Sequence, residues 1–150
     1  MAVLVIAEHD NQVLKTSTLN TITAAQKINN EVHLIILGKD IQTLSDTSKS
    51  IHLLSKVLKC DNEKLENFLP EILAPIIAKT ALSYSHVIAP ASTFGKNLLP
   101  RISALLDTTQ VSDIIGIENE NTFIRPIYAG NAISHVQTNQ EINLLTIRPS

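Results

Sequence analysis

Short apolar runs alternate with stretches of helical spacing over the first hundred residues. Four of these runs are rich in β-branched residues and most end at polar or small positions, a pattern that favours strands covered on both faces of a mainly parallel sheet. The predicted strands cover residues 3–7, 32–37, 56–58 and 86–89. The stretches between and after these strands therefore predict the helices that cover the sheet.

Each of the intervening stretches carries apolar residues about one helical turn apart. Ser17 and Thr18 are N-cap candidates for the first helix, and Asn29-Asn30 can end it in a left-handed conformation. The second helix should begin near Asp40 and the fourth after Ser92-Thr93. The four predicted stripes are Leu19, Ile22, Ala25 and Ile28; Ile41, Leu44, Ile51 and Leu54; Ile72, Leu73, Ile76 and Ile77; and Leu98, Leu99, Ile102, Leu105 and Leu106.

Prolines affect the third and fourth predicted helices. Pro70 suits the first turn of the third helix, where its missing N–H costs nothing. Pro75 removes a hydrogen bond if it lies inside the helix, so we expect either a late start or a kink there. Pro100 raises the same question for the first turns of the fourth helix.

The pattern changes after residue 111, where strand-like runs follow one another without a helical interval. These runs cover residues 111–118, 122–129, 132–138 and 142–147, and they predict antiparallel hairpins. Gly130-Asn131 is the best two-residue turn signal, and the other turn candidates are residues 119–121 and 139–140. Pro126 cannot donate to a ladder, so its strand should lie at an edge or carry a bulge.

These elements predict an α/β fold class. We expect a three-layer, Rossmann-like, mainly parallel sheet flanked by helices, with an antiparallel β-rich C-terminal part. A chain of 150 residues is of the usual size for one domain, so residues 1–150 are predicted to form a single α/β domain.

Composition narrows the partners and the compartment. The formal net charge is −2 and the basic residues are scattered, which argues against nucleic acid as a partner. Cys60 is the only cysteine, so an internal disulfide and a cysteine-rich zinc site are excluded. The first apolar run is too short for a signal, transit or membrane segment. We therefore expect no membrane insertion, and a location in the bacterial cytoplasm or the mitochondrial matrix.

No catalytic or metal site is predicted from the residues alone. Glu8, His9 and Asp10 form a candidate acid/base cluster, but neighbouring residues at a strand end point in different directions, so a structural role is preferred. Gly95-Lys96 lacks the spaced glycine of a phosphate-binding loop. The few aromatic residues are expected to pack in the core: Phe68, Tyr84, Phe94, Phe123 and Tyr128.

Three segments carry a resemblance to a known family. They read VLVIAEH, APASTFGKNLLPRISALLDTTQVSDI and TFIRPIYAGNAI, and the middle one follows no generic fold pattern. In order and spacing they resemble the N-terminal domain of the electron-transfer flavoprotein α subunit. The resemblance covers essentially the whole chain.

The resemblance implies a carrier rather than an enzyme. Members of this family form an αβ heterodimer that takes electrons from acyl-CoA dehydrogenases and other dehydrogenases and passes them through FAD to a quinone oxidoreductase. The FAD lies mainly in a C-terminal domain of the α subunit whose signature has no counterpart here. We therefore expect no cofactor in this domain, and either a shortened family protein or the product of a split or decayed gene.

Two groups of residues follow from this interpretation. We expect Thr93 or Ser92 to cap the fourth helix, Gly95 to allow a close backbone approach, and Arg101 to pair with Asp113. Open edges in the β-rich tail favour a contact with the β subunit, for which Arg125, Tyr128 and Asn131 are the candidates. The alternative is a stand-alone adenine-nucleotide-binding module, which the lack of a glycine-rich or acidic phosphate loop disfavours.

Overall fold

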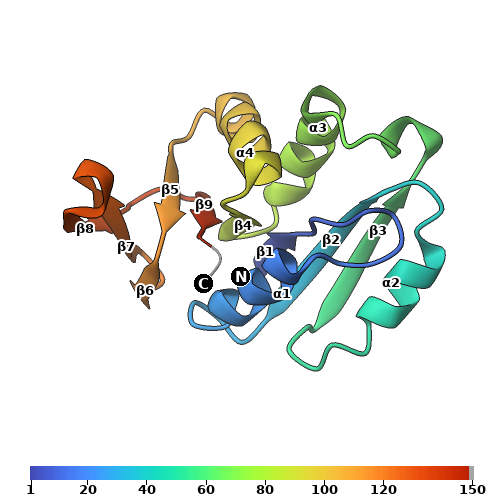
Figure 1. The fold of residues 1–150 in the computed structure, drawn as a ribbon, viewed down its shortest axis with the longest axis horizontal. Helices are drawn as coiled ribbons and strands as arrows, with labels where there is room; N and C mark the ends of the chain where they lie inside the picture. Colours follow the sequence, from blue (N-terminus) through green and yellow to red (C-terminus); the bar gives the residue numbers. More distant parts are fainter. Residues whose placement is uncertain (149–150) are drawn as a thin grey trace.

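The computed structural model describes residues 1–148 and contains two sheets (Figure 1). The larger has six strands in the order β3-β2-β1-β4-β9-β5, all paired in parallel. The smaller has three antiparallel strands in the order β6-β7-β8. The predicted α/β fold with a mainly parallel sheet is confirmed.

The large sheet is built from β1 (Val3–Ile6), β2 (Val32–Gly38), β3 (Lys56–Asp61), β4 (His86–Pro90), β5 (Gln110–Ile114) and β9 (Asn143–Ile147). The small sheet consists of β6 (Gly116–Asn119), β7 (Thr122–Ile127) and β8 (Ala132–Gln137). The helices are α1 (Thr16–Ala25), α2 (Gln42–Ser48), α3 (Pro70–Ala81) and α4 (Thr93–Leu106), with the short 3-10 turns η1 (Glu63–Leu65) and η2 (Tyr128–Gly130).

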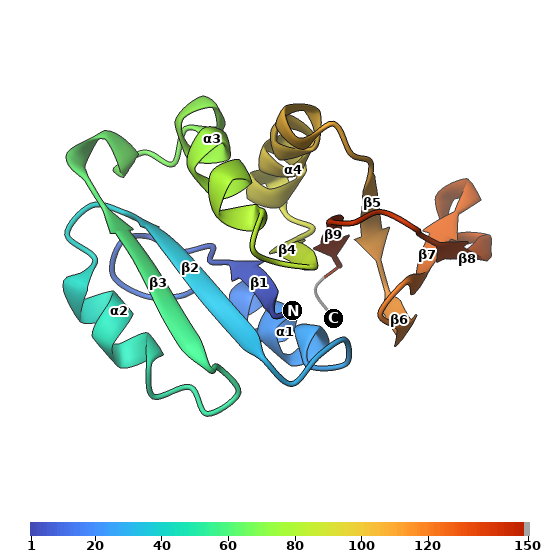
Figure 2. The same cartoon turned by 180° about the vertical axis from the view of Figure 1, so that it is seen from behind.

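The helices lie in two layers, one on each face of the large sheet. Helices α3 and α4 cover one face, and α1 and α2 cover the other (Figure 2). Each face has its own apolar cluster: Leu73, Ile77 and Leu98 belong to the first, and Ile22 and Leu44 to the second. Because both faces are buried, the central strands can be continuously apolar, which is the pattern that predicted them.

Three predicted helices differ in detail from the observed ones. Helix α2 ends at Ser48, so Ile51 and Leu54 belong to the following loop, where they still pack against the core. Leu19 and Leu105 were expected to be buried, but both are exposed. Apolar spacing predicted the helices correctly and overestimated the width of their buried faces.

Both questionable prolines lie inside helices. Helix α3 begins at Pro70 and Pro75 is an interior residue, so of the two expected alternatives the late start does not occur. Pro100 lies within α4. Both prolines are exposed, as are Glu71 and Lys96, the residues four positions earlier. Water can therefore satisfy the carbonyls that a proline leaves without a helical N–H.

The C-terminal strands depart most from the prediction. The run 111–118 is divided into β5 and β6, and only β6, β7 and β8 form antiparallel hairpins. Strand β9 was expected in a hairpin, but it inserts in parallel between β4 and β5. The expected two-residue turn at Gly130-Asn131 is a four-residue connection over residues 128–131.

Pro126 occupies β7, the central strand of the small sheet, so the expected edge-strand assignment was wrong for the strand as a whole. Ile124 O accepts a hydrogen bond from Ile115 N, so the backbone groups of Ile124 face β6, and those of Pro126, two residues later, face the same side. The pairing of β6 with β7 begins at Gly116, the first residue of β6, which lies opposite Ile124. Pro126 therefore lies beyond the β6 ladder, where no donor is needed.

Candidate functional site

Open parallel sheets bind ligands at the carboxyl ends of their strands, at the point where the strand order reverses. In this sheet the order reverses between β1 and β4, so the carboxyl end of β1 is the expected ligand position. Here the chain fills this position with its own side chains. Nε2 of His9 donates to the carbonyl oxygen of Leu37 at 2.9 Å, and Nδ1 accepts from the N–H of Asn11 at 2.9 Å. Burial lowers the pKa of His9, which fits the neutral ring that this pairing requires.

The carboxylates of Glu8 and Asp10, on either side of His9, stabilise the loop between β1 and α1. Glu8 accepts from the Ser17 hydroxyl at 2.9 Å and lies 3.7 Å from the Lys15 ammonium. Asp10 accepts from the N–H groups of Gln12 and Val13, and the bond from Val13 is the main reason that the pKa of its carboxyl is lowered. The three side chains face different partners, so they form no converging acid/base cluster.

The start of α4 packs tightly against the end of β4. The Ser92 hydroxyl accepts from the N–H of Gly95 at 3.4 Å, so Ser92 is the N-cap and Thr93 is the exposed first residue of the helix. A Cβ atom on Gly95 would lie 1.9 Å from the carbonyl oxygen of Pro90. The expected close backbone approach at Gly95 is therefore present.

The small sheet packs against the core through Phe123 of its central strand, with Ile117 of β6 and Val136 of β8 beside it. Phe123 on β7 is fully buried and belongs to the same apolar cluster as Val5 and Leu145. Its ring meets His86 edge to face, with centroids 6.4 Å apart. Nε2 of His86 donates to the carbonyl oxygen of Glu120, in the turn between β6 and β7. Burial lowers the pKa of His86.

The outer part of the same sheet is open. Tyr128 is 78% exposed, Ile133 is 59% exposed and Asn131 is exposed. Tyr128 was expected to pack in the core, and that expectation was wrong. It occupies the connection between β7 and β8, where Tyr128, Ala129 and Gly130 have φ values of 52°, 55° and 88°. A left-handed conformation is costly for Tyr and Ala, and such residues cluster at functional sites.

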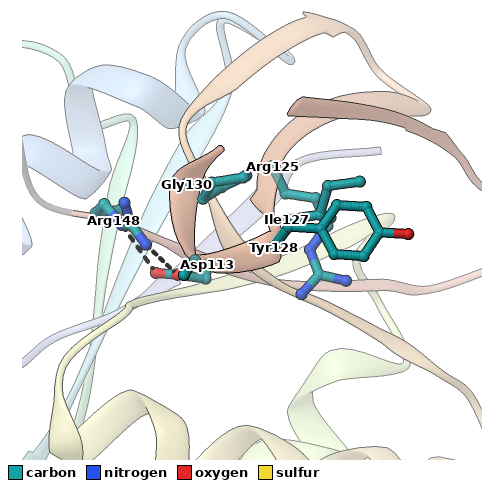
Figure 3. Close-up of a pocket in the computed structure, with 8 residues that line it drawn as sticks. Asp113, Arg125, Ile127, Tyr128, Gly130 and Arg148 are labelled. Atoms are coloured by element: carbon teal, nitrogen blue, oxygen red, sulfur yellow. Dashed lines mark hydrogen bonds and ion pairs between the residues drawn. The ribbon is translucent and has the colours of Figure 1, made fainter. Parts of the chain in front are cut away.

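A cavity of about 600 Å³ lies beneath this connection (Figure 3). On one side Arg148 donates to both carboxylate oxygens of Asp113, at 3.2 and 2.5 Å. On the other side are Arg125, Ile127 and Tyr128 (Figure 3). The hydrogen bonds from Arg148 are the main reason that the pKa of Asp113 is lowered.

The residues predicted from sequence are thus only partly brought together. Arg125 and Tyr128 line this cavity, and Asn131 lies beside it on the exposed connection. Arg101 was expected to pair with Asp113, but Asp113 pairs with Arg148 and Arg101 is an exposed residue of α4.

Arg148 was not predicted from the sequence, because its position beside Asp113 depends on the insertion of β9 next to β5. The available signal was Leu144-Leu145, two adjacent apolar residues that break the alternation expected of a half-buried hairpin strand.

No helix that the structure describes within residues 1–148 combines the length and apolar character needed to cross a bilayer. The same residues contain no cluster of three or more His, Cys, Asp or Glu side chains arranged to hold a metal ion.

Known proteins are similar in sequence to nearly the whole chain. Residues 3–150 match the electron transfer flavoprotein domain family. The chain is 46% identical over 148 residues to the electron transfer flavoprotein subunit alpha of Pseudomonas aeruginosa, covering 99% of this chain and 48% of that protein. It is 42% identical to the mitochondrial subunit alpha of Dictyostelium discoideum, covering 97% of this chain and 43% of the relative.

The chain thus spans about half the length of these relatives. With the family matched from residue 3 to residue 150, the chain belongs to the electron transfer flavoprotein domain family.

Proposed function

We propose that residues 1–150 form a single structural domain that docks the β subunit of an electron-transfer flavoprotein. The observation that carries this proposal is the small sheet, which is fixed to the core by Phe123 and leaves Tyr128 and Ile133 exposed on its outer side. Both of its outer strands, β6 and β8, have one edge outside the three-stranded ladder. Natural proteins normally cover such edges, and a second subunit does so efficiently.

The interface candidates fit this surface chemically. Tyr128 presents a large ring with a polar tip, a side chain enriched at protein interfaces. Arg125 lies beside it at the cavity, and Asn131 follows in the same connection. A strained connection supported by a packed sheet offers the partner a surface that is already ordered, which lowers the entropy cost of docking.

In the complete αβ protein we propose an electron carrier. It takes electrons from acyl-CoA dehydrogenases and other dehydrogenases through FAD and passes them to a quinone oxidoreductase. The names of the relatives, which are electron transfer flavoprotein α subunits of bacterial and mitochondrial origin, support this role. The matching location is the bacterial cytoplasm or the mitochondrial matrix.

The docking proposal is tested by binding to the β subunit of the same organism, measured by calorimetry. Ile133→Lys places a charge on the exposed side of β8 and should weaken binding about tenfold or more. Leu82→Lys is the matched control, because Leu82 is 64% exposed at the end of α3 and is not part of the small sheet. Equal affinities for both variants and the parent chain contradict the proposal.

We further propose that this domain by itself binds no FAD. Mass spectrometry of small molecules released from the denatured, purified chain checks this directly. Stoichiometric FAD in that preparation contradicts the proposal. Stoichiometric AMP or ATP supports the nucleotide-binding alternative instead.

A further inference from the structure

A second cavity, of about 330 Å³, adjoins the first and lies between α4 and strands β5, β7 and β9. Asp113 and Arg125 line both cavities. Donor-bearing side chains from four separate elements meet in the second cavity. Its lining residues are Lys96, Gln110, Ser112, Asp113, Arg125 and Thr146.

Arg125 is the unusual member of this set. Its Nε is buried and has no hydrogen-bond partner within residues 1–148. A buried guanidinium N–H without an acceptor is costly, and native proteins rarely leave one unpaired. Neither Arg125 nor Lys96 forms an ion pair with any residue that the structure describes. The missing acceptor is therefore expected to come from outside residues 1–148.

Asp113 does not supply that acceptor. Its carboxylate oxygens accept hydrogen bonds from Arg148 and none from Arg125, and its backbone N–H donates to the Thr146 hydroxyl at 2.8 Å. Beyond the main effect of Arg148, Lys96 and Arg125 also help to lower the pKa of Asp113, but Arg148 already balances this one carboxylate, so the site keeps an excess of two positive charges. Gln110 and Ser112 add an amide and a hydroxyl to the same wall.

We propose that this second cavity binds a phosphate group, held by Arg125 and Lys96 with Gln110 and Ser112 as neutral donors. The planar guanidinium fork matches two phosphate oxygens, and the ammonium supplies a point charge to a third. A phosphate dianion balances the two cations, whereas a carboxylate balances only one. The site does not depend on the docking proposal.

The test is a titration of the isotope-labelled chain with inorganic phosphate, followed by NMR at constant ionic strength. Saturable shifts are expected at Lys96, Ser112, Arg125 and Thr146. Acetate should bind more weakly at the same residues, and chloride should not saturate. Shifts that never saturate, or that chloride reproduces, overturn the proposal.

Three variants make the test specific. Arg125→Gln should weaken phosphate binding about tenfold or more, and Lys96→Gln by a smaller factor, because each removes a charge-assisted hydrogen bond. Lys96 is exposed, so this variant keeps the test valid if Arg125→Gln does not fold. The control is Lys79→Gln, an exposed lysine on α3 outside both cavities. Parent-like affinity in Lys96→Gln and in a folded Arg125→Gln overturns the proposal.

Discussion

Strands β1 and β9 of the large sheet are buried along their whole length, whereas β8 of the small sheet alternates half-buried and exposed residues. The large sheet is covered by helices on both faces, and the small sheet packs only its inner side, through Phe123 and its neighbours. The central strands of the large sheet are therefore enclosed, although its edge strand β3 is partly exposed. The small sheet is fixed to the core on its inner side and leaves Tyr128 and Ile133 exposed on the outside. A docking domain needs both properties, an ordered support and a free surface.

A substitution where the two sheets meet should change the free energy of unfolding the most. Phe123→Ala should lower the free energy of unfolding by about 3–5 kcal/mol, because it leaves a cavity in the shared core. Ile133→Ala, in the same small sheet, should change it by less than about 0.5 kcal/mol. Urea denaturation followed by circular dichroism measures both. Similar values for the two variants would mean that the small sheet is not anchored through Phe123.

Gly95 tests the tight packing of the large sheet against its helices. Gly95→Ala should cost about 1–3 kcal/mol, since the new Cβ collides with the backbone oxygen of Pro90 rather than with a movable side chain. Thr93→Ala, at the exposed start of the same helix, is the control. Thermal denaturation ranks the two. A Gly95→Ala variant as stable as the parent contradicts the close approach.

The two buried histidines, His9 after β1 and His86 on β4 where the large sheet meets Phe123, should titrate alike. Burial lowers the folded pKa of His9 and His86, so the unfolded chain binds protons first as the pH falls. Stability from each histidine is complete above its unfolded pKa of about 6.5 and decreases below it, by at most about 1.4 kcal/mol per pH unit. NMR titration of the ring protons, compared with the chain in urea, measures both pKa values. A folded pKa at or above the urea value contradicts the expected burial.

Removing the ion pair between Asp113 and Arg148 should change the free energy of unfolding the least. Asp113→Asn should cost about 0.5–1 kcal/mol near neutral pH, because the pair is partly solvated. The folded pKa of Asp113 is lowered, so its contribution is present above the unfolded pKa of about 3.9 and is lost as the pH falls below it. The stability difference between variant and parent, measured against pH, should disappear in acid. A difference that persists there would have another cause.

The sequence predicted the elements better than it predicted their partners. Local patterns placed all six strands of the large sheet near their observed positions, because apolar periodicity reports burial. They could not show that β9 pairs in parallel with β4 and β5, since a strand's sequence does not encode which strand lies beside it. Residues 143–147 are as completely buried as β1, yet they include Asn143 and Thr146, so only the adjacent pair Leu144-Leu145 pointed to a strand covered on both faces.

For the candidate site, too, residues close together in sequence were predicted, and residues brought together by the fold were not. Arg125 and Tyr128 were found because they lie close together in one segment that carried the family resemblance. Arg148 and Lys96 come from distant segments and reach the cavities only through the fold. The pairing of Arg101 with Asp113 was predicted because the two residues are close in sequence. The partner of Asp113 is instead Arg148, which the pairing of β9 with β5 brings beside it.

Hydrogen exchange of the chain, alone and with the β subunit, tests the central claim most directly. The account predicts that β1, β4 and β9 of the large sheet exchange slowly in both states, because these strands are fully buried. It predicts that new protection on binding appears in residues 116–137, the small sheet and its connections. New protection over α3, or none anywhere in the presence of bound partner, would contradict the claim that the small sheet is the docking surface.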